Sequence, residues 1–156
     1  MDFIQKTEKN NIIVSKIIKE WGSEIIVTRG KSYKAEDLDG ILVYNKDKLI
    51  GIGLYYIKDS ECEIVLLETF IQNKGIGTQI IEKIREITKK NNCSRLWLIT
   101  TNDNIDAIKF YQRKGFLIKN IYINAIEESR RIKPQIPLIG NYGIPIKDEI
   151  EFEIKI

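Results

Sequence analysis

Residues 72–78 have the sequence Gln72-Asn73-Lys74-Gly75-Ile76-Gly77-Thr78, between a strand-like run at 63–68 and a segment with helical periodicity. In that segment isoleucine recurs at 76, 80, 84 and 87, which gathers the apolar side chains on one helix face. A strand that turns through glycines into a helix directs backbone N–H groups at one point, beside the positive end of the helix dipole. Glycine also leaves room for a ligand near the backbone. The stretch therefore predicts a site for a phosphorylated ligand.

Two common phosphate-binding motifs do not fit this stretch. No Gly-Lys-[Ser/Thr] follows a second glycine at P-loop spacing, and Ile80 stands where a dinucleotide fingerprint needs its third glycine. A plain turn before a helix is the alternative that this motif alone leaves open.

A second motif follows at Asn104-Ile105-Asp106-Ala107-Ile108-Lys109-Phe110-Tyr111-Gln112-Arg113-Lys114-Gly115-Phe116. It comes after an apolar run at 95–101 that is typical of a buried strand. Residues 102–104 are N-cap candidates for the next helix, and Gly115 is suited to end it. The two motifs are thus joined by an expected helix at 75–92 and a strand at 95–101.

Gln-x-x-Gly-x-Gly followed by Asn-x-x-Ala-x-x-Phe-Tyr-x-x-x-Gly-Phe resembles the cofactor site of the GNAT superfamily of N-acetyltransferases, over residues 60–117. The resemblance implies that residues 72–78 hold the pyrophosphate of acetyl-CoA and that Asn104 bonds the pantetheine arm. It also implies that Ala107 lets this arm pass and that the hydroxyl of Tyr111 lies near the thioester sulfur. The cofactor-binding residues expected are Leu67, Thr69, Gln72, Asn73, Lys74, Gly75, Ile76, Gly77, Thr78, Asn104, Ala107 and Tyr111.

Two residues are candidates for proton transfer. Tyr111 is the expected general acid, because a phenol with a pKa of about 10 keeps its proton at neutral pH. Glu68 is the candidate base, with an ordered water chain as the alternative. Glu127, Glu128, Asp148 and Glu149 are weaker candidates, and with Arg130 and Arg131 they are expected to form a solvated charge cluster.

The composition of the chain excludes several kinds of chemistry. It has 156 residues, 43% apolar and 30% charged, with a net charge of +3 and no histidine. Ser–His and Cys–His catalysis are therefore excluded, and with only Cys62 and Cys93 a metal site is not expected. The cysteines are expected to pack in the core of a cytoplasmic protein. No basic and aromatic run suggests nucleic acid, and neither a signal peptide nor a membrane span is expected.

The expected fold is α/β (α+β), a single N-acetyltransferase domain over 1–156. It has a mixed, mostly antiparallel sheet of six or seven strands with helices on both faces, and the resemblance implies splayed central strands. A helix over 10–21 should bury Ile13, Ile17 and Trp21. Residues 23–33 are open between a short strand and a helical turn, and 116–126 is expected to be a strand. Gly51 and Gly53, inside a strand, are expected to allow close packing or a bulge.

The acceptor amine is left open. Residues 127–146 are either a surface excursion packed by Ile132, Ile136, Leu138 and Ile139 or a wall of the acceptor pocket. Trp21, Arg29 and Tyr33 either line that pocket or belong to the framework. The expected partner is a small-molecule amine or a protein amine, and a homodimer is left open. The competing function is an acyl-CoA sensor without catalysis. ATP or NAD binding would indicate a third class, a kinase or an oxidoreductase.

Overall fold

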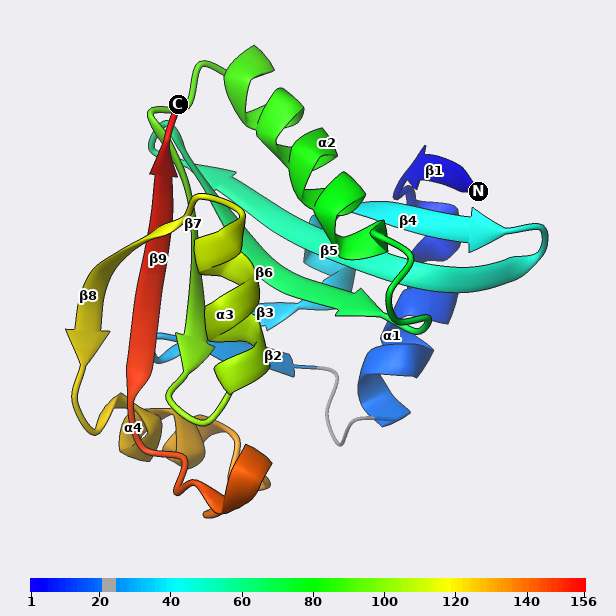
Figure 1. Cartoon of the computed structure of the whole chain (residues 1–156). Helices are drawn as coiled ribbons and strands as arrows, with labels where there is room; N and C mark the ends of the chain where they lie inside the picture. Colours follow the sequence, from blue (N-terminus) through cyan, green and yellow to red (C-terminus); the bar gives the residue numbers. More distant parts are fainter. Residues whose placement is uncertain (21–24) are drawn as a thin grey trace.

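The computed structural model describes residues 1–20 and 25–156 (Figure 1). Its main sheet has seven strands, in the order β1 (Asp2–Gln5), β4 (Asp39–Asn45), β5 (Lys48–Lys58), β6 (Glu61–Thr69), β7 (Arg95–Thr101), β9 (Glu149–Lys155), β8 (Leu117–Tyr122). Only β6 and β7 run parallel; the other neighbours are antiparallel. A separate hairpin is formed by β2 (Ile25–Thr28) and β3 (Lys31–Lys34). The predicted mixed, mostly antiparallel sheet is confirmed.

Helices cover both faces of the sheet, also as predicted (Figure 1). They are α1 (Asn11–Glu20), α2 (Ile76–Lys90), α3 (Ile105–Arg113) and α4 (Ala125–Ile132). One core cluster joins Ile80 and Ile84 of α2 to Val43 of β4, and the other joins Val14 of α1 to Leu42. Alternate residues of β4 therefore serve the two layers, as strand geometry requires. No helix in the described part of the chain is long and apolar enough to cross a membrane.

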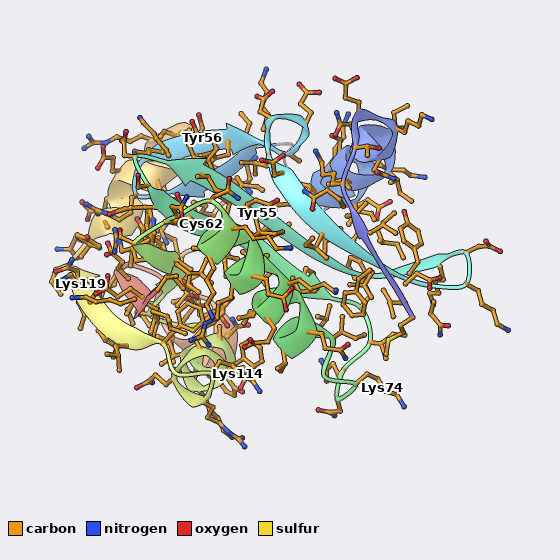
Figure 2. The ribbon with its side chains drawn as sticks, turned by 90° about the horizontal axis from the view of Figure 1, so that it is seen from above. Tyr55, Tyr56, Cys62, Lys74, Lys114 and Lys119 are labelled. Carbon is orange, nitrogen blue, oxygen red and sulfur yellow. The ribbon has the colours of Figure 1, made fainter. Side chains whose placement is uncertain are left out.

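Gly51 and Gly53 bring α2 onto the sheet. A Cβ at Gly53 would lie 2.3 Å from Cγ2 of Ile80, and one at Gly51 would lie 2.8 Å from Cγ2 of Ile76. The predicted close packing is confirmed. Figure 2, seen from above, labels Tyr55 and Cys62, which belong to the same core cluster.

The two central strands separate where the functional motifs begin. β6 and β7 pair from Glu61 with Arg95 as far as Ile64 with Leu98. Beyond that point β6 continues to Thr69 and β7 to Thr101 without further pairing to each other. The predicted splay is therefore present. It places the loop before α2 and the start of α3 at the open end of the strand pair.

Two predicted elements were wrong in part. In α1 the buried residues are Val14 and Ile18, whereas Ile13 is 39% exposed, and Trp21 lies outside the described residues. The strand predicted over 116–126 ends at Tyr122. Asn124 then takes a left-handed φ of 58°, and its N–H donates to Oδ1 of Asp148, so the chain turns into α4.

The open question at 23–33 is answered for its described part by the hairpin of β2 and β3. Its turn is formed by Arg29 and Gly30, with φ of 50° and 69°. Two consecutive positive φ values suit the tight twist of a two-residue hairpin loop.

The segment between β8 and β9 is held by hydrogen bonds more than by apolar burial. Leu138, Ile139 and Ile132 are 71%, 56% and 41% exposed, so these side chains do not supply the apolar packing that one of the two alternatives for this segment required. Instead, Arg130 donates to the carbonyl oxygens of Ile136, Pro137 and Ile146 at 3.3, 2.8 and 2.6 Å. The prediction that Arg130 belongs to a solvated charge cluster was wrong, because its guanidinium binds three backbone carbonyl oxygens of this segment.

Candidate active site

The residues predicted for the cofactor and for catalysis come together at one cavity of about 590 Å³. The cavity lies at the open end of β6 and β7, between the loop before α2 and α3. Its lining is Leu67, Glu68, Thr69, Ile71, Gln72, Asn73, Lys74, Gly75, Ile76, Gly77, Thr78, Asn104, Asp106, Ala107, Phe110 and Tyr111. Their roles stay predictions, but their shared location is a finding.

The loop before α2 has the shape of an anion-binding concavity. Asn73 and Gly75 both have left-handed backbones, with φ of 59° and 67°. Alternation of left-handed and other residues turns successive N–H groups inward. Residues 76–78 form the first turn of α2, where N–H groups have no acceptor within the helix. Lys74 is exposed on this loop (Figure 2).

The two glycines of the loop serve different physical needs. Gly75 is required by its backbone, because a Cβ there would meet nothing closer than 4.0 Å but φ is +67°. Gly77 is required by space, because its Cβ would lie 3.3 Å from Cζ of Phe110 and 3.7 Å from Cγ2 of Thr69. A side chain at 77 would fill the cradle between α2, β6 and α3.

Asn104, one of the three N-cap candidates at 102–104, is the N-cap of α3. Its Oδ1 accepts from the N–H of Ala107 at 3.4 Å, and its Nδ2 donates to Oγ1 of Thr100 at 3.2 Å. Each amide atom keeps a further hydrogen-bonding position, so capping fixes the side chain without exhausting it.

Tyr111 lines the cavity and is 8% exposed. Its ring packs edge-on against Phe110 and Phe116, with centroids 5.3 and 5.6 Å away. Burial, and secondarily the charge of Glu68, raises the pKa of the Tyr111 hydroxyl. The phenol therefore stays protonated at neutral pH.

Glu68 is the carboxylate that lines the cavity from β6. Burial raises its pKa, and a backbone hydrogen bond from Thr69 opposes that rise. A raised pKa makes a carboxylate a stronger base when it is ionised. Glu68 and Tyr111 thus line the same cavity, and the charge of the carboxylate contributes to the raised pKa of the phenol.

Sequence reasoning missed Ile71, Asp106 and Phe110 of the lining. A signal for Phe110 existed, because residues 104, 107, 110 and 111 share one face of a helix and Phe110 precedes Tyr111 in the motif. No pattern in the sequence distinguished Asp106 from an ordinary acidic residue in a first helical turn.

Arg29 and Tyr33, which the sequence left open between the acceptor pocket and the framework, both make contacts that join separate elements. The guanidinium of Arg29 lies 3.4 Å from the ring centroid of Tyr122, and the backbone N–H of Arg29 donates to Oε2 of Glu149. The Tyr33 hydroxyl donates to Glu63, a buried carboxylate that also accepts from Thr28. These contacts fasten the hairpin of β2 and β3 to β6 and β9. Trp21 lies outside the described residues.

Other candidates from the sequence are also structural. Glu149 is 2% exposed, and Asp148 accepts from the start of α4, so neither fits the role of a free base. Cys62 and Cys93 are buried, and burial raises the pKa of the Cys62 thiol to about 11. A thiol with a raised pKa is a poor nucleophile at neutral pH, which supports the predicted packing role.

Comparison with known proteins connects this geometry to a family. A model of the acetyltransferase (GNAT) family matches residues 14–116. The chain belongs to the GNAT acetyltransferase family. The Bacillus subtilis protein YxbD is 41% identical over 133 residues, which cover 85% of this chain and 84% of YxbD.

Solved structures show the same fold along nearly the whole chain. A Bacillus subtilis acetyltransferase in complex with CoA has a TM-score of 0.72 at 19% identity and covers 99% of this chain and 97% of its own. A GNAT family acetyltransferase from Elizabethkingia anophelis with acetyl-CoA bound has a TM-score of 0.71 at 18% identity, with coverage of 99% and 97%. Membership of the family supports acetyl transfer from acetyl-CoA as the general reaction.

Proposed function

We propose that this protein transfers the acetyl group of acetyl-CoA to a primary amine by direct attack in a ternary complex, with Tyr111 as general acid. The observation that carries the proposal is the single cavity in which the cradle of residues 72–78, Glu68 and Tyr111 meet. A phosphate-binding loop alone suits many ligands. A protonated phenol and a carboxylate in the same cavity supply the two proton transfers that amine acetylation needs.

Different residues of the cavity bind acetyl-CoA and transfer protons in this proposal. The N–H groups of the loop and of the first turn of α2 bind the pyrophosphate of acetyl-CoA, while Asn104 and the free edge of β6 at Leu67 and Thr69 orient the pantetheine arm. The amine nitrogen attacks the acetyl carbon, and the carbon–sulfur bond breaks. Tyr111 gives its proton to the departing thiolate. The proton of the amine leaves to Glu68, directly or through water.

The acceptor is proposed to be a small-molecule or protein amine, taken up in a soluble, cytoplasmic setting without nucleic acid or metal. A homodimer is compatible with β8, an edge strand that exposes Leu117, Ile118 and Ile121. Size-exclusion chromatography with light scattering gives the oligomeric state.

Two assays test the function. Acetyl-CoA and CoA should raise the melting temperature, whereas ATP and NAD should not; a ligand at a hundredfold excess over its Kd stabilises the native state by about 2.7 kcal/mol. A CoA-release assay over polyamines, amino acids, aminoglycosides and peptide N-termini then measures turnover. Binding without turnover of any amine would favour the sensor function, and absence of binding to folded protein would refute the proposal.

A further inference from the structure

The loop between β7 and α3 is tied to the segment 140–148 by side-chain hydrogen bonds of Asn102, Asp103 and Asp106. Asn102 accepts the N–H groups of Lys147 and Asp148 on Oδ1, both at 3.0 Å, and its Nδ2 donates to the carbonyl oxygen of Pro145 at 2.9 Å. The hydroxyl of Tyr142 donates to Oδ1 of Asp106 at 2.7 Å. The segment therefore rests on the N-terminal end of the helix that carries Ala107 and Tyr111.

Asp103 is the most buried member of this contact, with 3% exposure. Its Oδ1 accepts the hydroxyl of Thr101 at 2.5 Å, and its Oδ2 accepts the N–H of Asn141 at 2.9 Å. Gly140 lies so close that a Cβ there would come within 2.1 Å of Oδ2. The backbone of 140–141 is thus shaped around this carboxylate. A buried carboxyl group held by two donors is costly to leave without its hydrogen bonds, which favours this one arrangement of the two segments.

Asp103 also stands immediately before Asn104 and shapes the turn into α3. The N–H of Ile105 donates to the carbonyl oxygen of Asp103 at 2.8 Å, and the N–H of Asn104 donates to that of Thr101 at 3.1 Å. Side-chain and backbone bonds of Asp103 therefore fix the chain on both sides of Asn104.

We propose that Asp103 is a positioning residue for the acetyl-transfer reaction, acting through Asn104. The carboxylate holds the 140–148 segment against the β7–α3 loop, and this brace keeps the Asn104 amide aimed into the cavity for the pantetheine arm. The excursion between β8 and β9 is then a support of the cofactor site and not an unrelated surface loop. This inference rests on the proposed function, because it assigns Asn104 to acetyl-CoA.

The strained backbone at the contact supports a specific arrangement. Tyr142 has φ of 58° and ψ of 20°, a left-handed conformation that is unfavourable for a tyrosine, while its side chain is 70% exposed. Burial of the ring does not compensate this strain, whereas the bonds to Asp103 and Asp106 hold the turn in place. Strain of this kind persists only where the surroundings over-determine it.

The test compares Asp103→Ala and Asp103→Asn with a matched control, Asp148→Ala. Asp148 anchors the same segment through one side-chain bond to the N–H of Asn124, away from Asn104. Calorimetry gives the Kd for CoA, and steady-state kinetics give kcat and KM for acetyl-CoA. Melting temperatures report the loss of stability in each variant.

We expect Asp103→Ala to raise the Kd for CoA and the KM for acetyl-CoA about tenfold, with kcat at saturating acetyl-CoA within threefold of wild type. Asp103→Asn keeps one acceptor oxygen. Its rises in Kd and KM, expressed as logarithms, should be at most half of those of Asp103→Ala. Asp148→Ala should lower the melting temperature but leave both constants within twofold. If Asp103→Ala does not fold, the same comparison is made with Asp103→Asn alone, which should then raise the Kd by more than the Asp148→Ala control does, up to about threefold.

If the Asp103 variants lose stability but bind CoA as the Asp148→Ala control does, Asp103 is only structural and the inference is overturned. If the wild-type protein itself binds no CoA, the proposed function fails first, and this inference fails with it.

Discussion

Removing the hydroxyl of Tyr111 separates its two conceivable contributions, proton donation and packing. Tyr111→Phe keeps the ring that packs between Phe110, Phe116 and Phe152. None of the described residues hydrogen-bonds to this hydroxyl, so the substitution breaks no such bond within them. The free energy of unfolding should therefore change by less than about 0.5 kcal/mol, because the usual loss of about 1 kcal/mol arises only where a bond exists.

The expected effect on catalysis is much larger. A positioned general acid contributes about 10²- to 10⁴-fold, so we expect kcat to fall about a hundredfold, equivalent to about 2.7 kcal/mol of barrier. The raised pKa of Tyr111 means that the wild-type acid is loaded with its proton across the neutral range. The loss should shrink with an acyl donor whose leaving thiol is more acidic, since that thiolate needs a proton less.

The assay is CoA release with a saturating surrogate amine, and Tyr55→Phe is the matched control. Tyr55 is also buried, but its hydroxyl accepts from Nε2 of Gln5 at 2.9 Å, and it does not line the cavity. The control should lose about 1 kcal/mol of stability and keep its turnover. A Tyr111→Phe enzyme within twofold of the wild-type rate would refute the acid role. Loss of CoA binding in that variant would instead assign the hydroxyl to placement of acetyl-CoA.

Three further predictions follow from the same geometry. Gly77→Val should raise the Kd for CoA at least tenfold by calorimetry, because its side chain fills the cradle beside Phe110; unchanged affinity would mean that the loop is a plain turn. Gly53→Ala should cost about 1–3 kcal/mol in urea unfolding, since its Cβ overlaps Ile80, while the Kd for CoA stays within threefold. Because burial raises the pKa of Glu68, the acidic limb of the pH–rate profile should lie above the ordinary carboxyl value of about 4.3, and Glu68→Gln should remove it. A carboxyl pKa that is raised in the folded state lowers the free energy of unfolding as pH rises from the ordinary carboxyl pKa through the raised one. Glu68→Gln should therefore be at least as stable as wild type at pH 7; a marked loss of stability would indicate that the Glu68 carboxylate has a structural partner.

The sequence predicted the site better than it predicted the scaffold around it. Gly75 and Gly77 are informative because only glycine suits a left-handed turn and a close backbone approach, and both conditions hold in the structure. Asn104 was predicted as an N-cap for a similar reason: the chemistry lies in one residue and its immediate neighbours. Local constraints of this kind are visible in a sequence.

What the sequence did not predict depends on contacts between distant segments. Asp103 and Asn141 lie 38 positions apart, and nothing in either neighbourhood indicates their hydrogen bond. The strand predicted over 116–126 included Ala125 and Ile126, but a turn at Asn124, bonded to Asp148, starts a helix there. The hydrogen bonds of Arg130 could not be predicted, because its three acceptors are backbone carbonyl oxygens and every residue carries one. The sequence therefore indicated only a solvated charge.

A bulge in β6 is the feature that connects the scaffold to the chemistry. Leu54 pairs with Leu66 and Tyr55 with Ile64, so Val65 is an extra residue, immediately after the last pair between β6 and β7. Cys62 and Ile64 pack in the core cluster under α2, and so does Leu67, whereas Val65 and Leu66 pack in the cluster of α1.

The extra residue therefore shifts the alternation of side chains by one position. Strand alternation then places Leu67 and Thr69 on the face of α2, beside the cradle, and Glu68 on the opposite face. Without Val65 as an extra residue, these faces would be exchanged. Because residues 64–67 are apolar on both faces, the periodicity of the sequence carries no sign of the shift. One unpaired residue thus decides which side of the open strand pair receives the carboxylate proposed to act as the base.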